Sequence, residues 1–315
     1  MDILMLNETE VHSLLDPDAL LEALAEGFKA QSSGLVDAPK RNEITIPNAG
    51  FLLAMPAYQQ DREITVKLVS VFHGNEQLGI PAHQALICLF DPQTGTPLSI
   101  MDGTYITALR TAGAAALSTR LLARTDTNVL AIVGAGVQGH SHLRMLPRVR
   151  PFSEIRIASL HIAHAEQLAT TDSRVRVVKT AEEAVRGADV VCLCTNAGEP
   201  VISPDWLTPG MHITSVGYSP PGGELDPRVI EQGRLFVETR LAFESPPVGC
   251  GELAGFDPRI GTELGEVLLD QRLGRQSKDE ITVYKAMGHA SEDMAAASLV
   301  YHRAQQERIG RIIAL

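Results

Sequence analysis

The sequence lacks a long apolar run, an excess of positive charge and a secretory signal. A helix that spans a bilayer needs about 20 consecutive apolar residues, and no segment of the 315 residues reaches that length. The net charge is −11, which argues against nucleic acid as the main partner. The first 16 residues are acidic and have no basic segment, unlike a signal peptide. We therefore expect a soluble, cytoplasmic protein that binds neither membranes nor nucleic acids.

Cysteine is also scarce, with only Cys88, Cys192, Cys194 and Cys250 in the chain. Cys192 and Cys194 lie in the apolar run ADVVCLCTN, which is typical of a buried strand, and no His/Cys cluster has the spacing of zinc ligands. Reduced core cysteines are the simplest interpretation for a cytosolic protein. We expect no metal ion.

The most informative segment that is present is VLAIVGAGVQG, residues 129–139. An apolar run leads into a turn with glycines at 134, 136 and 139, and a helix-compatible pattern follows. In a dinucleotide-binding turn, Gly134 adopts the backbone angles of the tight turn and Gly136 lets the main chain approach a pyrophosphate. Gly139 allows close packing of helix and strand, and the helix N-terminus faces the anion. The segment predicts a dinucleotide site.

The pattern on either side of residue 128 differs. Downstream, strands expected near 129–133, 155–158, 175–178, 189–194, 212–216 and 234–236 alternate with helical stretches. This alternation predicts an α/β fold with a doubly wound parallel sheet. Upstream, we expect a helix pair at 8–31 with Asp16 and Pro17 at a helix start, an antiparallel-looking sheet at 41–100, and a helix at 104–122. The stretch from residue 281 is interpreted as a loop and then a long helix.

The nucleotide preference is predicted from the residues that follow the second strand of the parallel sheet, expected at 155–158, where NAD-binding sites usually carry Asp or Glu. Here that position offers Ser159 and His161 and no carboxylate. The 2′-phosphate of NADP would not be repelled there, although no arginine is obviously placed to hold it. We favour NADP(H), with NAD(H) as the alternative. The sequence is explained equally well if His161 is an exposed loop histidine that makes no contact with the cofactor.

Three basic residues stand out by their surroundings. Lys67 lies in the apolar strand ITVKLVSVF, on the same face as Thr65 and Val69. Arg110 lies among small residues in YITALRTAGAAALS, and Arg41 begins a strand. Each has an ordinary surface interpretation when taken alone, since long basic side chains commonly extend from an apolar surface into water.

Together these segments resemble the ornithine cyclodeaminase/mu-crystallin family. The resemblance covers essentially the whole chain, in the same order and spacing. The segments that carry it are MPAY at 55–58, VKLVSVFHGN at 66–75, IPAHQALICLFDPQTGTPLSIMDG at 80–103, ALRTAGAAALST at 108–119, VGAGVQG at 133–139, VGYSPPGGELDP at 216–227 and YKAMGHASEDMAAA at 284–297. It implies a substrate-binding and dimerisation domain of the α+β type, residues 1–112 plus the C-terminal helix 291–315. An NAD(P)-binding Rossmann domain would comprise 113–290, and the protein would be a homodimer.

The resemblance also implies roles for particular residues. Arg41 and Arg110 would bind a substrate carboxylate, which a guanidinium group can hold with two parallel hydrogen bonds. Lys67 would be the catalytic residue that contacts the carboxylate and the reacting C=N group. Met287 and Gly288 match a loop that closes over the substrate. The pyrophosphate loop comprises Gly134, Ala135, Gly136, Val137 and Gln138, and Thr111 and Thr195 are further candidate cofactor contacts.

One departure from the family pattern separates the possible activities. Ornithine cyclodeaminases carry an aspartate directly after the glycine of the VG strand, and this chain has Tyr218 after Gly217. Asp226, in ELDP, is interpreted as structural. Without that aspartate we favour a ketimine reductase of proline metabolism, an oxidoreductase that converts Δ1-pyrroline-2-carboxylate or Δ1-piperideine-2-carboxylate to L-proline or L-pipecolate. Tyr218 would then line the substrate pocket. The alternatives are an ornithine cyclodeaminase, an alanine or N-alkyl amino acid dehydrogenase, and a non-catalytic binding protein.

Overall fold

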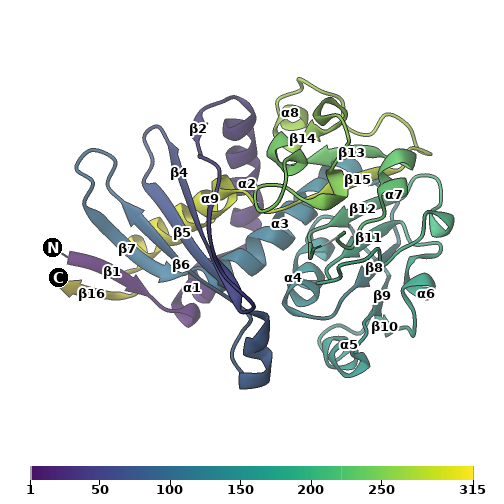
Figure 1. Cartoon of the computed structure of the whole chain (residues 1–315), viewed down its shortest axis with the longest axis horizontal. Helices are drawn as coiled ribbons and strands as arrows, with labels where there is room; N and C mark the ends of the chain where they lie inside the picture. The colour runs from purple at the N-terminus through teal and green to yellow at the C-terminus, as the bar shows by residue number, and fades with distance from the viewer. Residues whose placement is uncertain (1, 221, 315) are drawn as a thin grey trace. The chain divides into compact units, whose positions relative to one another are not determined.

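The computed structural model describes residues 2–220 and 222–314, and the chain divides into two compact units (Figure 1). Unit 1 comprises Met1–Arg110 and His289–Leu315, and unit 2 comprises Thr111–Gly288. The division falls within helix α3 (Thr104–Leu122), which matches the helix expected at 104–122. Pro221, in the motif at 216–227, lies outside the described residues.

Unit 1 is built on one mixed sheet with the strand order β16-β1-β7-β6-β5-β4-β2, and β3 pairs with β4. Its strands are β1 (Asp2–Leu6), β2 (Val36–Asp37), β3 (Asn42–Ile46), β4 (Gly50–Gln59), β5 (Ile64–Val71), β6 (His83–Phe90), β7 (Pro97–Asp102) and β16 (Arg311–Ala314). The sheet expected at 41–100 is present as β3 to β7. These five strands pair antiparallel, as expected. Outside that range, β1 lies parallel to β7 and β16 adds a further edge strand.

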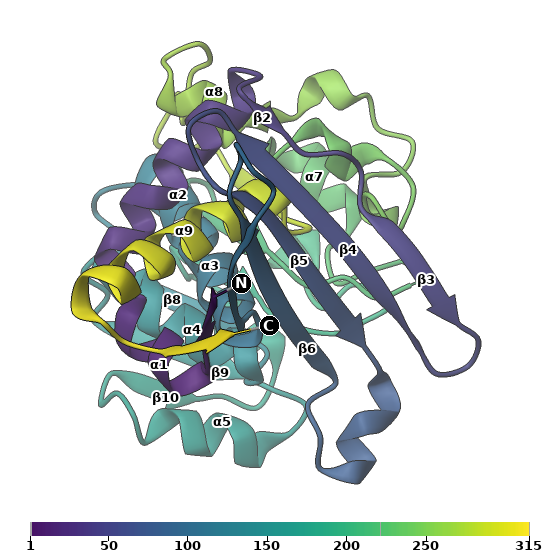
Figure 2. The same ribbon diagram turned by 90° about the vertical axis from the view of Figure 1, so that its left-hand side faces the viewer.

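The helices of unit 1 are α1 (Glu8–Leu14), α2 (Pro17–Ser32) and α9 (Ala290–Glu307). The Asp16 carboxylate accepts a hydrogen bond from the Ala19 N–H at 2.8 Å and Pro17 is the first helical residue, as expected. Figure 2 shows α2 and α9 side by side, and α9 also packs against β4, β5 and β6. Because side chains alternate along a strand, Thr65, Lys67 and Val69 are buried together on one face of β5.

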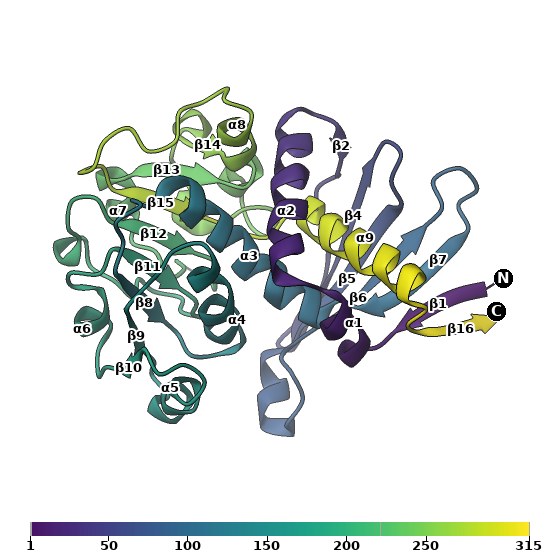
Figure 3. The same ribbon diagram turned by 180° about the vertical axis from the view of Figure 1, so that it is seen from behind.

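Unit 2 contains a parallel sheet with the order β10-β9-β8-β11-β12-β15-β13-β14 (Figure 3). Its strands are β8 (Val129–Val133), β9 (Glu154–Ala158), β10 (Val175–Val177), β11 (Val190–Leu193), β12 (His212–Ser215), β13 (Arg234–Val237), β14 (Thr262–Glu263) and β15 (Thr282–Lys285). The helices that follow α3 in this unit are α4 (Val137–Met145), α5 (Ile162–Ala169), α6 (Ala181–Val185), α7 (Pro227–Gln232) and α8 (Leu264–Leu268). The doubly wound parallel sheet is therefore confirmed.

One expectation for this unit was wrong. The start of the segment at 281–310 was expected to be a loop, but Thr282–Lys285 is a fully buried strand between β12 and β13. A strand buried on both faces has no alternating pattern, and four residues are too few to reveal it by periodicity. The long helix expected after it is α9.

Candidate functional site

The glycine turn joins β8 to α4 and has the geometry that the sequence predicted. Gly134 has φ +108°, and a Cβ atom there would lie 2.4 Å from the Cys194 carbonyl oxygen. A Cβ on Gly139 would lie 2.2 Å from the Gly134 carbonyl oxygen. A Cβ on Gly136, in contrast, would enter open space with nothing within 4 Å. The turn thus leaves room for a group that approaches its main chain at Gly136, as a dinucleotide pyrophosphate does.

The rest of this loop is also compatible with binding of a dinucleotide. Gly136 is the N-cap of α4 and provides no side-chain cap, so the first turn of the helix can receive an anion. Ala135 is buried, Gln138 is partly buried and Val137 is 68% exposed. The carboxyl end of β9 lies beside the turn, since the Gly134 N–H donates to the Ala158 carbonyl at 2.8 Å. Ser159 and His161 follow directly, with the His161 N–H donating to Ser159 Oγ at 3.2 Å.

On the other side of β8, a buried carboxylate ties together the ends of β11 and β12. Glu224 is fully buried and accepts four hydrogen bonds. One of its oxygens accepts from the N–H and the hydroxyl of Thr195, both at 2.7 Å. Its other oxygen accepts from the Ser215 hydroxyl at 2.9 Å and from the Gly217 N–H at 2.7 Å. Glu224 is therefore a buried carboxyl group whose four hydrogen bonds fix both loops.

Lys285, at the end of β15, completes this network. Its ammonium group forms an ion pair with Glu252 at 2.6 Å, and neither side chain is exposed. The same ammonium donates to the Gly217 carbonyl at 2.6 Å and to Ser215 Oγ at 3.1 Å. Glu252 in turn accepts from the Leu225 N–H at 3.0 Å. Gly217 is therefore held through both its N–H and its carbonyl group, which fixes the backbone directly before Tyr218.

The remaining predicted residues of unit 2 lie in buried or partly buried positions. Tyr218 is partly buried and, with Met287, packs against the hydrophobic core of this unit. The Met287 N–H donates to a Glu238 carboxylate oxygen at 2.8 Å, and Gly288 has φ +77°. Thr111 is 8% exposed in α3. Asp226 is the N-cap of α7 and accepts from the Arg228 N–H at 2.8 Å, the structural role expected for it.

In unit 1 the structure brings two of the three predicted basic residues, Lys67 and Arg110, into one cluster. Lys67 is 1% exposed and its ammonium group lies 2.7 Å from an Asp293 oxygen. The other Asp293 oxygen lies 3.0 Å from Arg110 Nε, and Arg110 Nη1 lies 3.2 Å from Glu292. Asp293 and Glu292 come from the first turn of α9, Lys67 from β5 and Arg110 from α3. The ordinary surface interpretation of Lys67 and Arg110 is therefore wrong.

The electrostatics of the cluster favour an anionic ligand. Burial lowers the pKa of Lys67 to about 8; Asp293 opposes this shift, while Arg110 and Arg41 add to it. The ammonium group is therefore incompletely compensated by Asp293, and a bound carboxylate would stabilise it. The field of Arg41 reaches both Lys67 and His289, which places this predicted residue near the cluster.

Two histidines of the same cluster were not identified from the sequence. Burial, together with the nearby charges of Lys67 and Arg110, lowers the pKa of His83 to about 4. Burial lowers the pKa of His289 to about 4 as well, with Arg41 as the next contribution. Both imidazoles are thus neutral near pH 7 and can exchange hydrogen bonds with a ligand. A lone histidine at a strand start or a helix cap carries no signal in a single sequence.

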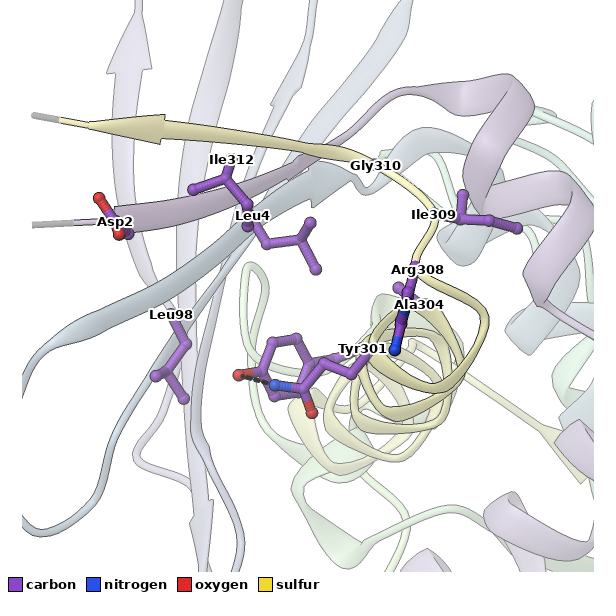
Figure 4. A pocket seen from close by; sticks show the side chains of 10 residues that line it. Asp2, Leu4, Leu98, Tyr301, Ala304, Arg308, Ile309, Gly310 and Ile312 are labelled. Atoms are coloured by element: carbon purple, nitrogen blue, oxygen red, sulfur yellow. Dashed lines mark hydrogen bonds between the residues drawn. The ribbon is translucent and has the colours of Figure 1, made fainter.

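Unit 1 also contains a separate pocket of about 400 Å³ (Figure 4). Its apolar lining includes Leu4, Leu98, Tyr301, Ile309 and Ile312, and Gln305 donates to the Tyr301 hydroxyl at 2.8 Å. The predicted site residues are not among those that line it. In the described part of the chain, no three His, Cys, Asp or Glu side chains are arranged to bind a metal ion. Nor does any helix there have the length and apolarity needed to cross a membrane.

Comparisons with known proteins identify the family that the chain resembles. The model of the ornithine cyclodeaminase/mu-crystallin family matches residues 1–308. Mouse ketimine reductase mu-crystallin is 41% identical over 293 residues, which cover 92% of this chain and 91% of the mouse protein. The structure of Δ1-pyrroline-2-carboxylate reductase from Thermococcus litoralis, in complex with NADH and L-proline, matches with a TM-score of 0.92 and 30% identity. That match covers 99% of this chain and all of the other.

An archaeal alanine dehydrogenase dimer with bound NAD matches over the full length of both chains, with a TM-score of 0.90 and 30% identity. The family model spans nearly the whole chain, and the mouse relative exceeds 40% identity. The protein therefore belongs to the ornithine cyclodeaminase/mu-crystallin family.

Proposed function

We propose that this protein is an NAD(P)H-dependent ketimine reductase that reduces a small cyclic imino acid, Δ1-pyrroline-2-carboxylate or Δ1-piperideine-2-carboxylate, to L-proline or L-pipecolate. The observation that carries the proposal is the buried cluster in which Asp293 holds both Lys67 and Arg110. Charged groups are costly to bury and serve no packing purpose there. Their occurrence in a chain that also has a dinucleotide turn supports an oxidoreductase for an anionic substrate.

The dinucleotide is assigned to unit 2 because the glycine turn has the space for it. Gly134, Ala135, Gly136, Val137 and Gln138 would hold the pyrophosphate at the N-terminus of α4. When bound, the reduced nicotinamide supplies a hydride. Thr195 and Gly217 follow β11 and β12, on the side of β8 opposite to β9, and would contact the nicotinamide half.

The roles of the unit 1 residues follow from their chemistry. Arg110 and Arg41 would bind the substrate carboxylate, and Asp293 fixes the Arg110 guanidinium through Nε. Lys67 would hold a proton at the imine nitrogen, because a protonated C=N group accepts a hydride more readily. A lysine with a pKa of about 8 is well matched to that exchange near neutral pH.

A cyclodeaminase is disfavoured by the residues around Tyr218. The carboxylate nearest to this position in the sequence is Glu224, and its two oxygens are already engaged by four donors. It cannot bind a distal substrate amine without breaking that network. An alanine dehydrogenase activity, which uses an open-chain imine, remains the second candidate, because the archaeal neighbour with that name is similar over the whole chain.

NADP(H) is the proposed physiological cofactor. The chain after β9 continues Ser159, Leu160, His161 and offers no carboxylate to bind the two ribose hydroxyls of NAD. A 2′-phosphate meets no negative side chain on this segment. Two structural neighbours were solved with NADH or NAD, so NAD(H) is the alternative cofactor.

A homodimer is the proposed assembly, formed through the face of the unit 1 sheet opposite to Lys67. Leu68 and Leu86 are directly paired across β5 and β6 and are 37% and 52% exposed, and Ile44 on β3 is 62% exposed. An exposed apolar sheet face is a common interaction surface, and a second copy would cover it symmetrically. The name of the archaeal neighbour describes a dimer. We expect Leu86→Glu to shift the protein from dimer to monomer in analytical ultracentrifugation.

The proposed activity is tested by mixing the protein with NADPH or NADH and following oxidation of the nicotinamide with each cyclic imino acid. A second reaction contains L-ornithine and catalytic NAD. Rapid oxidation with an imine and no ammonia from ornithine supports the reductase. Proline formed from ornithine would overturn it, and nucleotide binding without turnover of any imine or amino acid would favour a binding protein.

A further inference from the structure

Three histidines of unit 2 gather where β9 ends. His161 is the N-cap of α5 and His164 lies in its first turn, with 5.4 Å between the two ring centroids. His140 lies in α4, directly after Gly139 of the dinucleotide turn. Burial lowers the pKa of His140, and the charge of His164 lowers it further, so these two imidazoles are also close. All three residues are solvent-exposed.

The position of this histidine cluster matches the adenosine half of a dinucleotide. In doubly wound folds, the end of the second strand lies beside the ribose that carries the 2′ group. Exposed apolar side chains surround the cluster: Leu160 is fully exposed, Ile162 is 46% exposed and Val137 is 68% exposed. An adenine ring would cover such a surface. Among the described residues, no three His, Cys, Asp or Glu side chains are arranged to bind a metal ion, and this holds for the histidine cluster as well.

The surrounding elements provide little competing charge. On β9, Glu154 is engaged by Arg156 at 2.9 Å, at the opposite end of the strand, and Arg176 on β10 lies 3.7 Å from the same Glu154. The other charged side chains on the adjoining elements are Arg144 on α4, Glu166 on α5 and Lys179 after β10. Glu166 is two residues from His164, a spacing at which helical side chains do not face each other.

We propose that His140, His161 and His164 bind the 2′-phosphate of NADP(H), and that they take up protons when it binds. The inference rests on the proposed function, since it assigns the cofactor specificity of the same site. Imidazolium groups that lie close together repel one another, and a phosphate dianion between them removes that repulsion. Binding of NADP is therefore coupled to protonation. The affinity of the protein for NADP⁺ therefore rises as the pH falls from about 8 to about 6.5, a range in which the phosphate is still mostly dianionic.

NAD provides an internal control because it lacks the 2′-phosphate. We expect its affinity to be nearly constant over this pH range. The ratio of the NAD⁺ and NADP⁺ dissociation constants should therefore rise roughly tenfold between pH 8 and pH 6.5, the equivalent of one charge-assisted hydrogen bond. Isothermal titration calorimetry of the full chain with each nucleotide measures both constants without turnover. The same titrations in buffers of different ionisation enthalpy measure the protons taken up.

The variants are His161→Asn, His164→Asn and the double variant, with His73→Asn, an exposed histidine of unit 1, as the matched control. We expect the double variant to lose the pH dependence and the proton uptake with NADP⁺ while its NAD⁺ affinity stays unchanged. His73→Asn should behave as the unsubstituted protein. A ratio that does not change with pH, or one that changes equally in the double variant, would overturn the inference. If neither nucleotide binds to the unsubstituted protein, the proposed function itself fails.

Discussion

An Asp293 carboxylate oxygen lies 2.7 Å from the ammonium group of Lys67, and neither side chain reaches solvent. The same carboxylate binds Arg110 through its other oxygen. One residue of α9 therefore fixes both Lys67, which we assign to the imine nitrogen of the substrate, and Arg110, which we assign to its carboxylate. Asp293 also raises the pKa of Lys67 against the larger effect of burial.

The first prediction concerns the pH dependence of imine reduction. The rate should require protonated Lys67, so kcat/KM should fall as the pH rises through about 8. Replacement of Asp293 by Asn removes a charge that raises the pKa of Lys67, and the fall should then begin at lower pH. Glu307→Gln, on an exposed position of the same helix, is the control and should leave the profile unchanged. An unchanged profile in Asp293→Asn would show that Asp293 does not act through Lys67.

The same substitution should also lower stability. Two buried cations lose their shared anion, and loss of one partner of a buried ion pair typically costs about 3–5 kcal/mol. Thermal unfolding of Asp293→Asn and Glu307→Gln should therefore separate the two variants clearly. The pH profile is compared at a temperature at which both remain folded, so that a loss of stability is not mistaken for a change in mechanism.

The second prediction concerns Arg110. Arg110→Lys keeps the charge but loses the planar group that can hold a carboxylate with two hydrogen bonds. We expect KM for the imino acid to rise about 10- to 100-fold, the equivalent of one hydrogen bond to a charged group. The affinity for NADPH should not change. The unsubstituted protein and Arg110→Lys should reduce the uncharged amide of the same imino acid equally poorly. A difference between the two proteins with the amide would argue against carboxylate binding by Arg110.

The sequence predicted the parts of the fold and site that depend on local patterns. The turn at Gly134–Gly139 requires glycines at fixed positions, and Asp16 with Pro17 marks a helix start, so both could be identified in a single chain. Strand β15 could not, because a short strand buried on both faces has no period. Its position between β12 and β13 depends on contacts with segments far away in the sequence.

The residues that support the site were missed for a related reason. Asp293 and Glu292 lie in the first turn of a helix, where acidic residues are ordinary because of the helix dipole. Only the structure shows that these carboxylates bind Lys67 and Arg110. Similarly, Lys285 at the end of a strand suggests a solvated side chain until its ion pair with Glu252 is seen. Partners that are distant in sequence leave no trace in local patterns.

The third prediction uses two glycines of the same turn. A Cβ on Gly136 would enter open space, so Gly136→Ala should fold normally but lose affinity for NADP(H), because the methyl group takes the room of the pyrophosphate. A Cβ on Gly139 would lie 2.2 Å from the Gly134 carbonyl oxygen, so Gly139→Ala should instead lower the unfolding temperature. Calorimetric titration and thermal unfolding of the pair distinguish the two effects. Normal nucleotide binding by Gly136→Ala would contradict the assignment of this turn.

The fourth prediction concerns the carboxylate of Glu224, which accepts hydrogen bonds from Thr195, Ser215 and Gly217. In Glu224→Gln one oxygen becomes an NH₂ group, which cannot accept, so the backbone N–H on that side loses its acceptor and the hydroxyl beside it must reverse its hydrogen bond. The loops after β11 and β12 should then be less well fixed. Because β11 and β9 lie on opposite sides of β8, this change should affect the nicotinamide half of the cofactor and not the adenosine half.

The measurement compares NADPH with adenosine 2′,5′-bisphosphate, which contains only the adenosine half with its 2′-phosphate. Glu224→Gln should weaken NADPH binding and lower kcat while adenosine 2′,5′-bisphosphate binds as before. Glu231→Gln, an exposed position on α7, is the matched control. Equal weakening of both ligands would indicate a general loss of structure in unit 2. Selective weakening of NADPH would instead support a role for Glu224 in positioning the loops around the reacting ring, because those loops and β9 lie on opposite sides of β8.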